Sequence, residues 1–131
     1  MPATAYTANL IATALKNGAA YQGPATVYLA LATTVPSATV AGVEVTLGDY
    51  ARATFAQSGW TNDGAGSLTN TADIDYPLVT ENYDDDVVAM EAYTAASDGT
   101  RLWWIELTTP KIIFVGQTPK FLAGDLTLTV V

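Results

Sequence analysis

The feature that most constrains this chain is a series of short segments whose side chains alternate between two faces. In TVYLALA, residues 26–32, Val27, Leu29 and Leu31 point one way and the residues between them the other. The final stretch, LTLTV, repeats the pattern. Because successive side chains of a strand point to opposite faces, period-two alternation predicts half-buried β-strands.

Similar segments recur along the chain, separated by turn residues. Short strands spaced by about 8–12 residues are typical of a β-sandwich. Asp98-Gly99 predicts a hairpin tip, and Thr109-Pro110 predicts the end of a strand. We therefore predict a mainly β chain, an antiparallel β-sandwich or jelly roll, forming one domain over residues 1–131. The further predicted strands are residues 49–57, 67–77, 86–94, 102–107, 111–115 and 120–131.

One helix is expected, over residues 4–17. Thr4 or Thr7 can cap its start, Lys16 complements the dipole of its last turn, and Gly18 can adopt the left-handed conformation after it. A narrow apolar stripe suggests that the helix lies on another surface. Residues 1–18 are thus predicted to form an N-terminal helical arm, whose stripe consists of Leu10, Ile11, Ala14 and Leu15.

The charge composition argues against several classes of partner. The formal net charge is −8, and only 14% of residues are charged. Nucleic-acid binders and proteins that bind anionic membranes normally present a basic surface, so neither partner is expected. No stretch approaches the roughly 20 apolar residues of a membrane span, and the N-terminus lacks the features of a secretory signal. A low charged fraction also suits a surface that is partly covered by neighbouring proteins.

Catalytic chemistry has few candidates in this sequence. Cysteine and histidine are both absent, which excludes thiolate and imidazole chemistry. Glu91 and Glu106 are a weak candidate pair for glycoside hydrolysis, which needs two carboxyl groups across a cleft. We expect no enzyme activity and no cofactor. An acidic set offers oxygen ligands for calcium, but it lacks the glycine and closing glutamate of an EF-hand, so a solvated acidic loop is favoured; it comprises Asp73, Asp75, Glu81, Asp84, Asp85 and Asp86.

The aromatic residues suggest either a sugar-binding platform or an interface anchor. Trp103 and Trp104 are adjacent, so in a strand one faces the core and the other faces outward. An outward tryptophan is a frequent anchor of protein interfaces. The sequence leaves open which of the two is buried.

Five ordered strings resemble a family of small tailed-phage structural proteins, commonly labelled phage tail fibre proteins, some of them similar to capsid decoration (cement) proteins. The resemblance covers nearly the whole chain and implies a virion component with a β-sandwich fold that acts as a homotrimer and has no catalytic motif. The strings are PATVYLALATTVP (24–36), GDYARATF (48–55), LTNTADIDYP (68–77), LTTPKIIFVGQTPKF (107–121) and AGDLTLTV (123–130).

Two functional hypotheses follow. The first is a capsid decoration protein that binds the major capsid protein on the outer surface and stabilises the shell. The alternative is a tail fibre or tail-tip module that contacts host receptor glycans. Contacts with other subunits are predicted at Pro2, Tyr6, Trp60, Tyr83 and Trp103.

Overall fold

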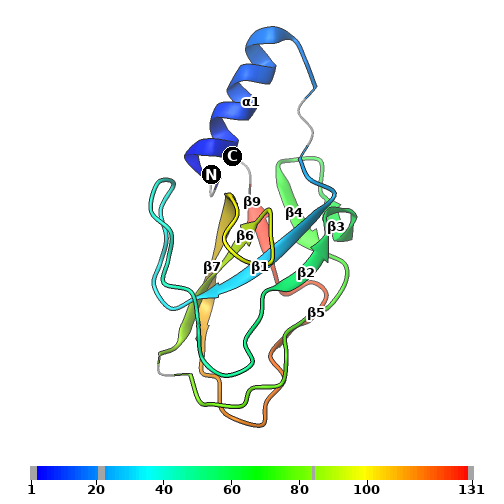
Figure 1. Ribbon diagram of the computed structural model, residues 1–131. Coiled ribbons are helices and arrows are strands. Elements are labelled where there is room, and N and C mark those ends of the chain that lie inside the picture. Colours follow the sequence, from blue (N-terminus) through cyan, green and yellow to red (C-terminus); the bar gives the residue numbers. More distant parts are fainter. Residues whose placement is uncertain (1–2, 21–22, 84, 130–131) are drawn as a thin grey trace.

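The computed structural model describes residues 3–20, 23–83 and 85–129 (Figure 1). Its helix, α1 (Ala5–Asn17), matches the predicted one. The hydroxyl of Thr4 accepts a hydrogen bond from the Thr7 N–H at 3.3 Å, which caps the N-terminus. Gly18 ends the helix in the left-handed conformation, with φ at 66°. The capping residues seen in the sequence therefore set both ends of the helix.

Nine strands and one short 3₁₀ helix follow in the described residues, and the strands pair antiparallel. The three sheets have the strand orders β2-β1-β6-β7, β3-β4-β9 and β5-β8. A mainly β fold with one N-terminal helix is thus confirmed. The elements are β1 (Thr26–Ala32), β2 (Ala53–Ala56), η1 (Gln57–Gly59), β3 (Trp60–Asn62), β4 (Ser67–Asn70), β5 (Ile74–Asp75), β6 (Val87–Tyr93), β7 (Arg101–Lys111), β8 (Lys120–Phe121) and β9 (Thr127–Thr129).

A single hydrophobic cluster joins the three sheets, as in a sandwich. The alternating residues of β1 are fully buried in it, and members of β5, β8 and β9 complete it. The buried Tyr76 hydroxyl donates a hydrogen bond to the Leu29 carbonyl at 3.0 Å, which ties the segment after β5 to β1. The alternation therefore identifies the cluster face correctly, but β1 is not half-buried throughout, because Ala30 and Ala32 on its other face are also fully buried. The fully buried β1 positions on the cluster side are Val27, Leu29 and Leu31.

Several strand predictions need correction. β7 does not end at Thr109-Pro110 but continues to Lys111. β7 lies at the edge of its sheet and has no neighbouring strand on one side, so a proline whose nitrogen faces that side interrupts no hydrogen bond between strands. Residues 112–115, predicted as strand, form none. Four successive apolar residues have no period-two pattern, and only Ile113 of them is buried. The predicted strands 67–77 and 120–131 are each divided, into β4 and β5 and into β8 and β9, and the two parts of each lie in different sheets. Residues 130–131 lie outside the described part.

β7 connects the two ends of the molecule. Its first residues contact the base of α1, and its last residue leads into the loop 112–119. Figure 1 shows α1 standing out from one end of the β-sheets, with this loop at the other end. Among the described residues, no helix is long and apolar enough to cross a membrane.

Candidate functional site

The helix α1 is attached to the body by its first turn only. The Thr4 hydroxyl lies 2.8 Å from the Arg101 carbonyl and 3.0 Å from the Leu102 carbonyl, and the Thr4 N–H donates to Leu102 at 3.0 Å. Thr7 is the one buried residue of the helix. The later turns therefore extend away from the sheets (Figure 1).

An apolar surface on α1 is left uncovered. Leu15 is 78% exposed and Tyr6 is 51% exposed. Short helices are marginal in water and gain most of their stability from packing an apolar face. A helix with so little packing within its own chain is suited to packing against another molecule. We call this the helix surface; it consists of the exposed Tyr6, Leu10 and Leu15 with the half-buried Ile11 and Ala14 between them.

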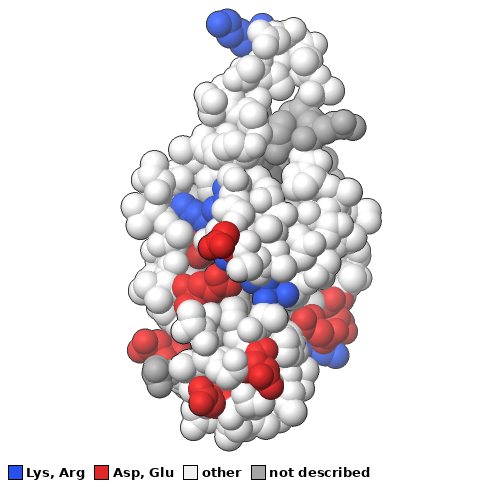
Figure 2. All heavy atoms as spheres, viewed as in Figure 1, with Lys and Arg blue, Asp and Glu red and all other residues white. Residues whose placement is uncertain are grey.

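Charge is distributed unevenly between the helix and the body. Residues 1–43 contain one charged side chain, Lys16, whereas residues 44–131 contain 13 acidic and 4 basic ones, a net charge of 4 − 13 = −9. In Figure 2 the acidic side chains lie on the lower part of the molecule and a basic group marks the helix tip. The two ends of the molecule therefore differ in electrostatic character.

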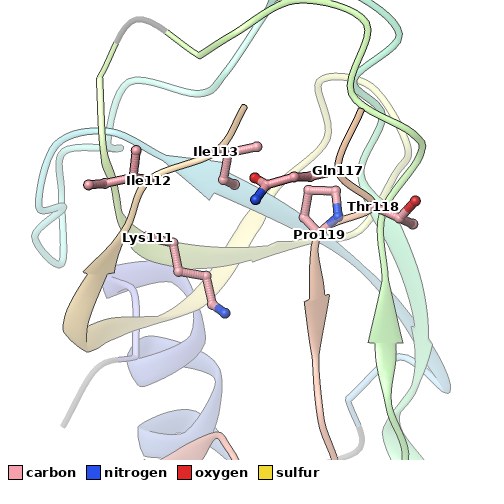
Figure 3. Close-up of a pocket in the computed structure, with 6 residues that line it drawn as sticks. All are labelled: Lys111, Ile112, Ile113, Gln117, Thr118 and Pro119. Atoms are coloured by element: carbon pink, nitrogen blue, oxygen red, sulfur yellow. The ribbon is translucent and has the colours of Figure 1, made fainter. Parts of the chain in front are cut away.

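A second apolar region lies at the opposite end, where a hollow of about 380 Å³ opens beside the end of β7 (Figure 3). Ile113 and Pro119 are its buried lining residues, and the neighbouring Phe114 and Val115 are more than half exposed. Backbone hydrogen bonds of 2.8–3.2 Å join this loop to residues 79–83 and hold it in place. We call this the hollow; it is lined by Lys111, Ile112, Ile113, Gln117, Thr118 and Pro119.

A buried ion pair holds the loop after β1 against the four-stranded sheet. Glu91 on β6 is fully buried, and its Oε2 lies 3.3 Å from Nη1 of Arg101 on β7 and accepts the Gly42 N–H at 3.3 Å. Arg101 also donates to the Ser37 carbonyl. Burial raises the pKa of Glu91, and the Gly42 N–H and Arg101 oppose that rise. These groups are structural, because they pair with one another inside the chain.

Glu91 gives a pH-dependent prediction. Its pKa is raised in the folded state, so the folded protein holds this proton more tightly than the unfolded chain does. The free energy of unfolding of the native protein, relative to Glu91→Gln, should rise as pH falls from 7 through the folded pKa, and level off below the unfolded pKa. Urea unfolding at several pH values measures this difference; a difference that shrinks on acidification would contradict the prediction.

The five predicted contact residues do not share one surface. Pro2 lies outside the described residues. Tyr6 is exposed on α1, and Tyr83 is half-buried near the hollow, with its N–H donating to the Ile113 carbonyl at 3.2 Å. Tyr6 and Tyr83 therefore lie at opposite ends of the molecule, and their contacts with other subunits stay predictions.

The selection of Trp103 needs correction. Trp103 is only 7% exposed, and its ring packs edge-on against Trp60, with 5.7 Å between ring centroids. Trp60 packs in turn on Phe55, and its indole N–H donates to Gln57. The outward member of the adjacent pair is Trp104, which is half-buried beneath Arg101. An aromatic platform built on Trp60 and Trp103 is therefore mainly internal.

The structure places the carboxylates of the glycosidase hypothesis and those of the calcium hypothesis. Glu91 is buried against Arg101, whereas Glu106 is exposed two pairs away on the ladder, so the two do not flank a cleft. Asp73 accepts the Ala123 N–H and lies with Asp75 around Lys120. In residues 3–20, 23–83 and 85–129, no group of three or more acidic side chains is placed to hold a metal ion.

The sequence interpretation missed the hollow. The sequence feature at this place is KIIFV, an apolar run without alternation, for which we predict a strand. Consecutive exposed apolar residues are unusual outside binding surfaces. The exposed members of this region are Leu78, Ile112, Phe114 and Val115.

Exposed apolar surfaces at both ends of a small mainly β protein are typical of proteins that attach to other proteins. Comparison with known families identifies the family: residues 2–129 match the one described as "Podophage GP4 fiber I protein gp80", and the chain belongs to that family. No curated protein matches the chain. It is therefore a tailed-phage virion structural protein that associates with other virion proteins, in the tail or on the capsid exterior.

Proposed function

We propose that this protein is a virion fibre subunit that attaches to the particle through its helix surface. The observation that carries the proposal is α1 itself, an almost uncovered helix whose apolar face includes Leu15 at 78% exposure. The family's description as a fibre protein supports the functional class. The acidic body would then point away from the attachment point.

Incorporation into particles tests the attachment. Leu10→Ser with Leu15→Ser removes apolar area from the helix surface, and both side chains are exposed, so the body should still fold. We expect at least a tenfold lower content of this protein in purified virions, measured by quantitative mass spectrometry. Val43→Ser is the matched control, since Val43 is 60% exposed on the loop after β1. Normal incorporation of the double variant would overturn the proposal.

Capsid decoration is the second candidate. It is favoured by the compact body, because the described residues contain no repeated shaft of the kind expected in a long fibre. A decoration protein binds only the assembled shell and so stabilises it by mass action. Particles that lack the protein should melt at a lower temperature than native particles. Native particles should carry many copies of it. Copy number and position in a cryo-EM map of the virion separate the two candidates.

The homotrimer implied by the resemblance is part of this proposal. Sedimentation equilibrium of the purified protein should then report three times the 13.7 kDa of one chain. A concentration-independent mass of 13.7 kDa would contradict it.

We further propose a binding role without catalysis. Support comes from Glu91, whose Oε2 is engaged by Arg101 and Gly42 and whose side chain is closed to solvent. Release of soluble sugars from bacterial cell wall or capsule by the purified protein, lost in Glu91→Gln with Glu106→Gln, would overturn this proposal.

A further inference from the structure

The loop after β1 lies beside the base of α1. The Ala5 N–H, in the first turn of the helix, donates a hydrogen bond to the Ala38 carbonyl at 2.9 Å. Arg101 joins the same two segments, because its carbonyl accepts the Thr4 hydroxyl at 2.8 Å and its guanidinium donates to the Ser37 carbonyl. Figure 1 shows this loop, in cyan, extending from the end of β1 toward α1. The loop and the helix therefore meet at one end of the molecule.

The part of this loop nearest the helix exposes apolar side chains. Val40 is 64% exposed and Val35 is 55% exposed. Residues 33–43 contain no charged side chain. We call residues 35–40 the loop tip. Together with the helix surface, the loop tip gives this end of the molecule an apolar surface next to a single charged side chain from residues 1–43, that of Lys16.

The loop tip is held in one conformation by bonds within the chain. The Ser37 N–H donates to the Val40 carbonyl at 2.8 Å, and the Val40 N–H donates to the Ser37 hydroxyl at 3.1 Å. Val43 lies outside the loop tip, at the root of the loop, where it bonds to Thr33 and Thr34. A segment that is already ordered loses little conformational entropy when it binds. The loop tip is therefore prepared for a contact with another molecule.

The helix surface alone is small for a stable attachment. The helix has 13 residues. A helix of this length is about 20 Å long and about 10 Å wide, so one face offers on the order of a few hundred Å². A stable interface buries about 800 Å² on each partner. Attachment through the helix surface therefore needs a second contact, and the loop tip adds exposed apolar area at the base of the helix.

We infer that the loop tip is a second part of the surface by which this protein attaches to the virion, and that its partner there is an apolar, uncharged surface of another virion protein. This inference rests on the proposed attachment through the helix surface and extends it. The side chains of Val35 and Val40 carry no hydrogen-bonding group, so the loop tip offers little to a glycan. An apolar protein surface is the partner that matches it, and the family associates with other virion proteins.

Single cysteines test the contact, because the native chain has none. Val40→Cys places a thiol on the loop tip and Leu15→Cys places one on the helix surface. Both side chains are exposed, so the fold should be retained. Each variant is treated with a maleimide, once as purified protein and once in intact virions, and mass spectrometry of the substituted peptide gives the labelling rate. We expect both thiols to be labelled at least tenfold more slowly in virions than in the purified protein.

Leu78→Cys is the matched control. Leu78 is 56% exposed and lies at the opposite end of the molecule, in the region of the hollow. Its labelling rate should be the same in virions as in the purified protein.

The outcomes separate this inference from the proposal on which it rests. Equal labelling of Val40→Cys in both samples, with Leu15→Cys protected in virions, would overturn the inference and leave attachment through the helix surface in place. If neither thiol were protected, both would fail. Slow labelling of Val40→Cys already in the purified protein would show that copies of this chain cover the loop tip. Protection of Leu78→Cys in virions would show that the particle covers both ends of the molecule. Either of these last two results overturns the inference.

Discussion

Replacing Arg101 by alanine is expected to destabilise the protein by about 3–5 kcal/mol, the range for breaking a buried ion pair by removing one partner. Glu91 is fully buried, and the Arg101 side chain is only 9% exposed. Without the guanidinium, the carboxylate keeps the Gly42 N–H as its one remaining partner. The loop after β1 also loses the hydrogen bond from Arg101 to the Ser37 carbonyl. Urea unfolding at pH 7 gives the difference in free energy of unfolding.

Lys120→Ala is the matched control for this prediction. Lys120 also forms an ion pair, at 3.4 Å from Asp75, but its side chain is 46% exposed. Exposed pairs contribute at most about 1 kcal/mol, so this variant should unfold almost as the native protein does. Similar, small losses of stability in both variants would contradict the prediction that burial makes the loss of Arg101 costly.

Replacing Asn70 by alanine should lower the free energy of unfolding by about 1–3 kcal/mol. Asn70 is 1% exposed, and its side-chain amide donates to the Ala72 and Leu122 carbonyls at 2.9 and 3.0 Å. Its Oδ1 accepts the Leu126 N–H at 2.9 Å. Removing the amide leaves the buried Leu126 N–H without its partner, which costs about 1–3 kcal/mol, whereas Ala72 and Leu122 are exposed residues whose carbonyls can turn to water. The same bonds hold β9 next to β4, so the last strand should lose protection from hydrogen exchange.

Asn82→Ala provides the comparison. Its Oδ1 also accepts a backbone hydrogen bond, from Val115 at 2.7 Å, but at an exposed site where water replaces it. The expected loss is below about 1 kcal/mol. Equal effects of the two asparagine variants would contradict the structural role assigned to Asn70.

Some of the fold could be read directly from local patterns. Thr4 and Gly18 define the ends of α1 because capping depends on neighbours within one helical turn. Asp98 and Gly99 form the hairpin tip with φ values of 54° and 77°, as their turn preference predicts. The local pattern gave a wrong prediction at residues 112–115. Instead of a strand, the loop 112–119 forms backbone hydrogen bonds to residues 79–83.

The candidate surfaces divide in the same way. The apolar stripe of α1 and the lack of acidic residues near it are properties of the sequence alone. The hollow, the Glu91–Arg101 pair and the burial of Trp103 rather than Trp104 were decided only by the tertiary structure. These features join residues distant in the chain, and periodicity tells which side chains share a face but not which face the rest of the chain covers.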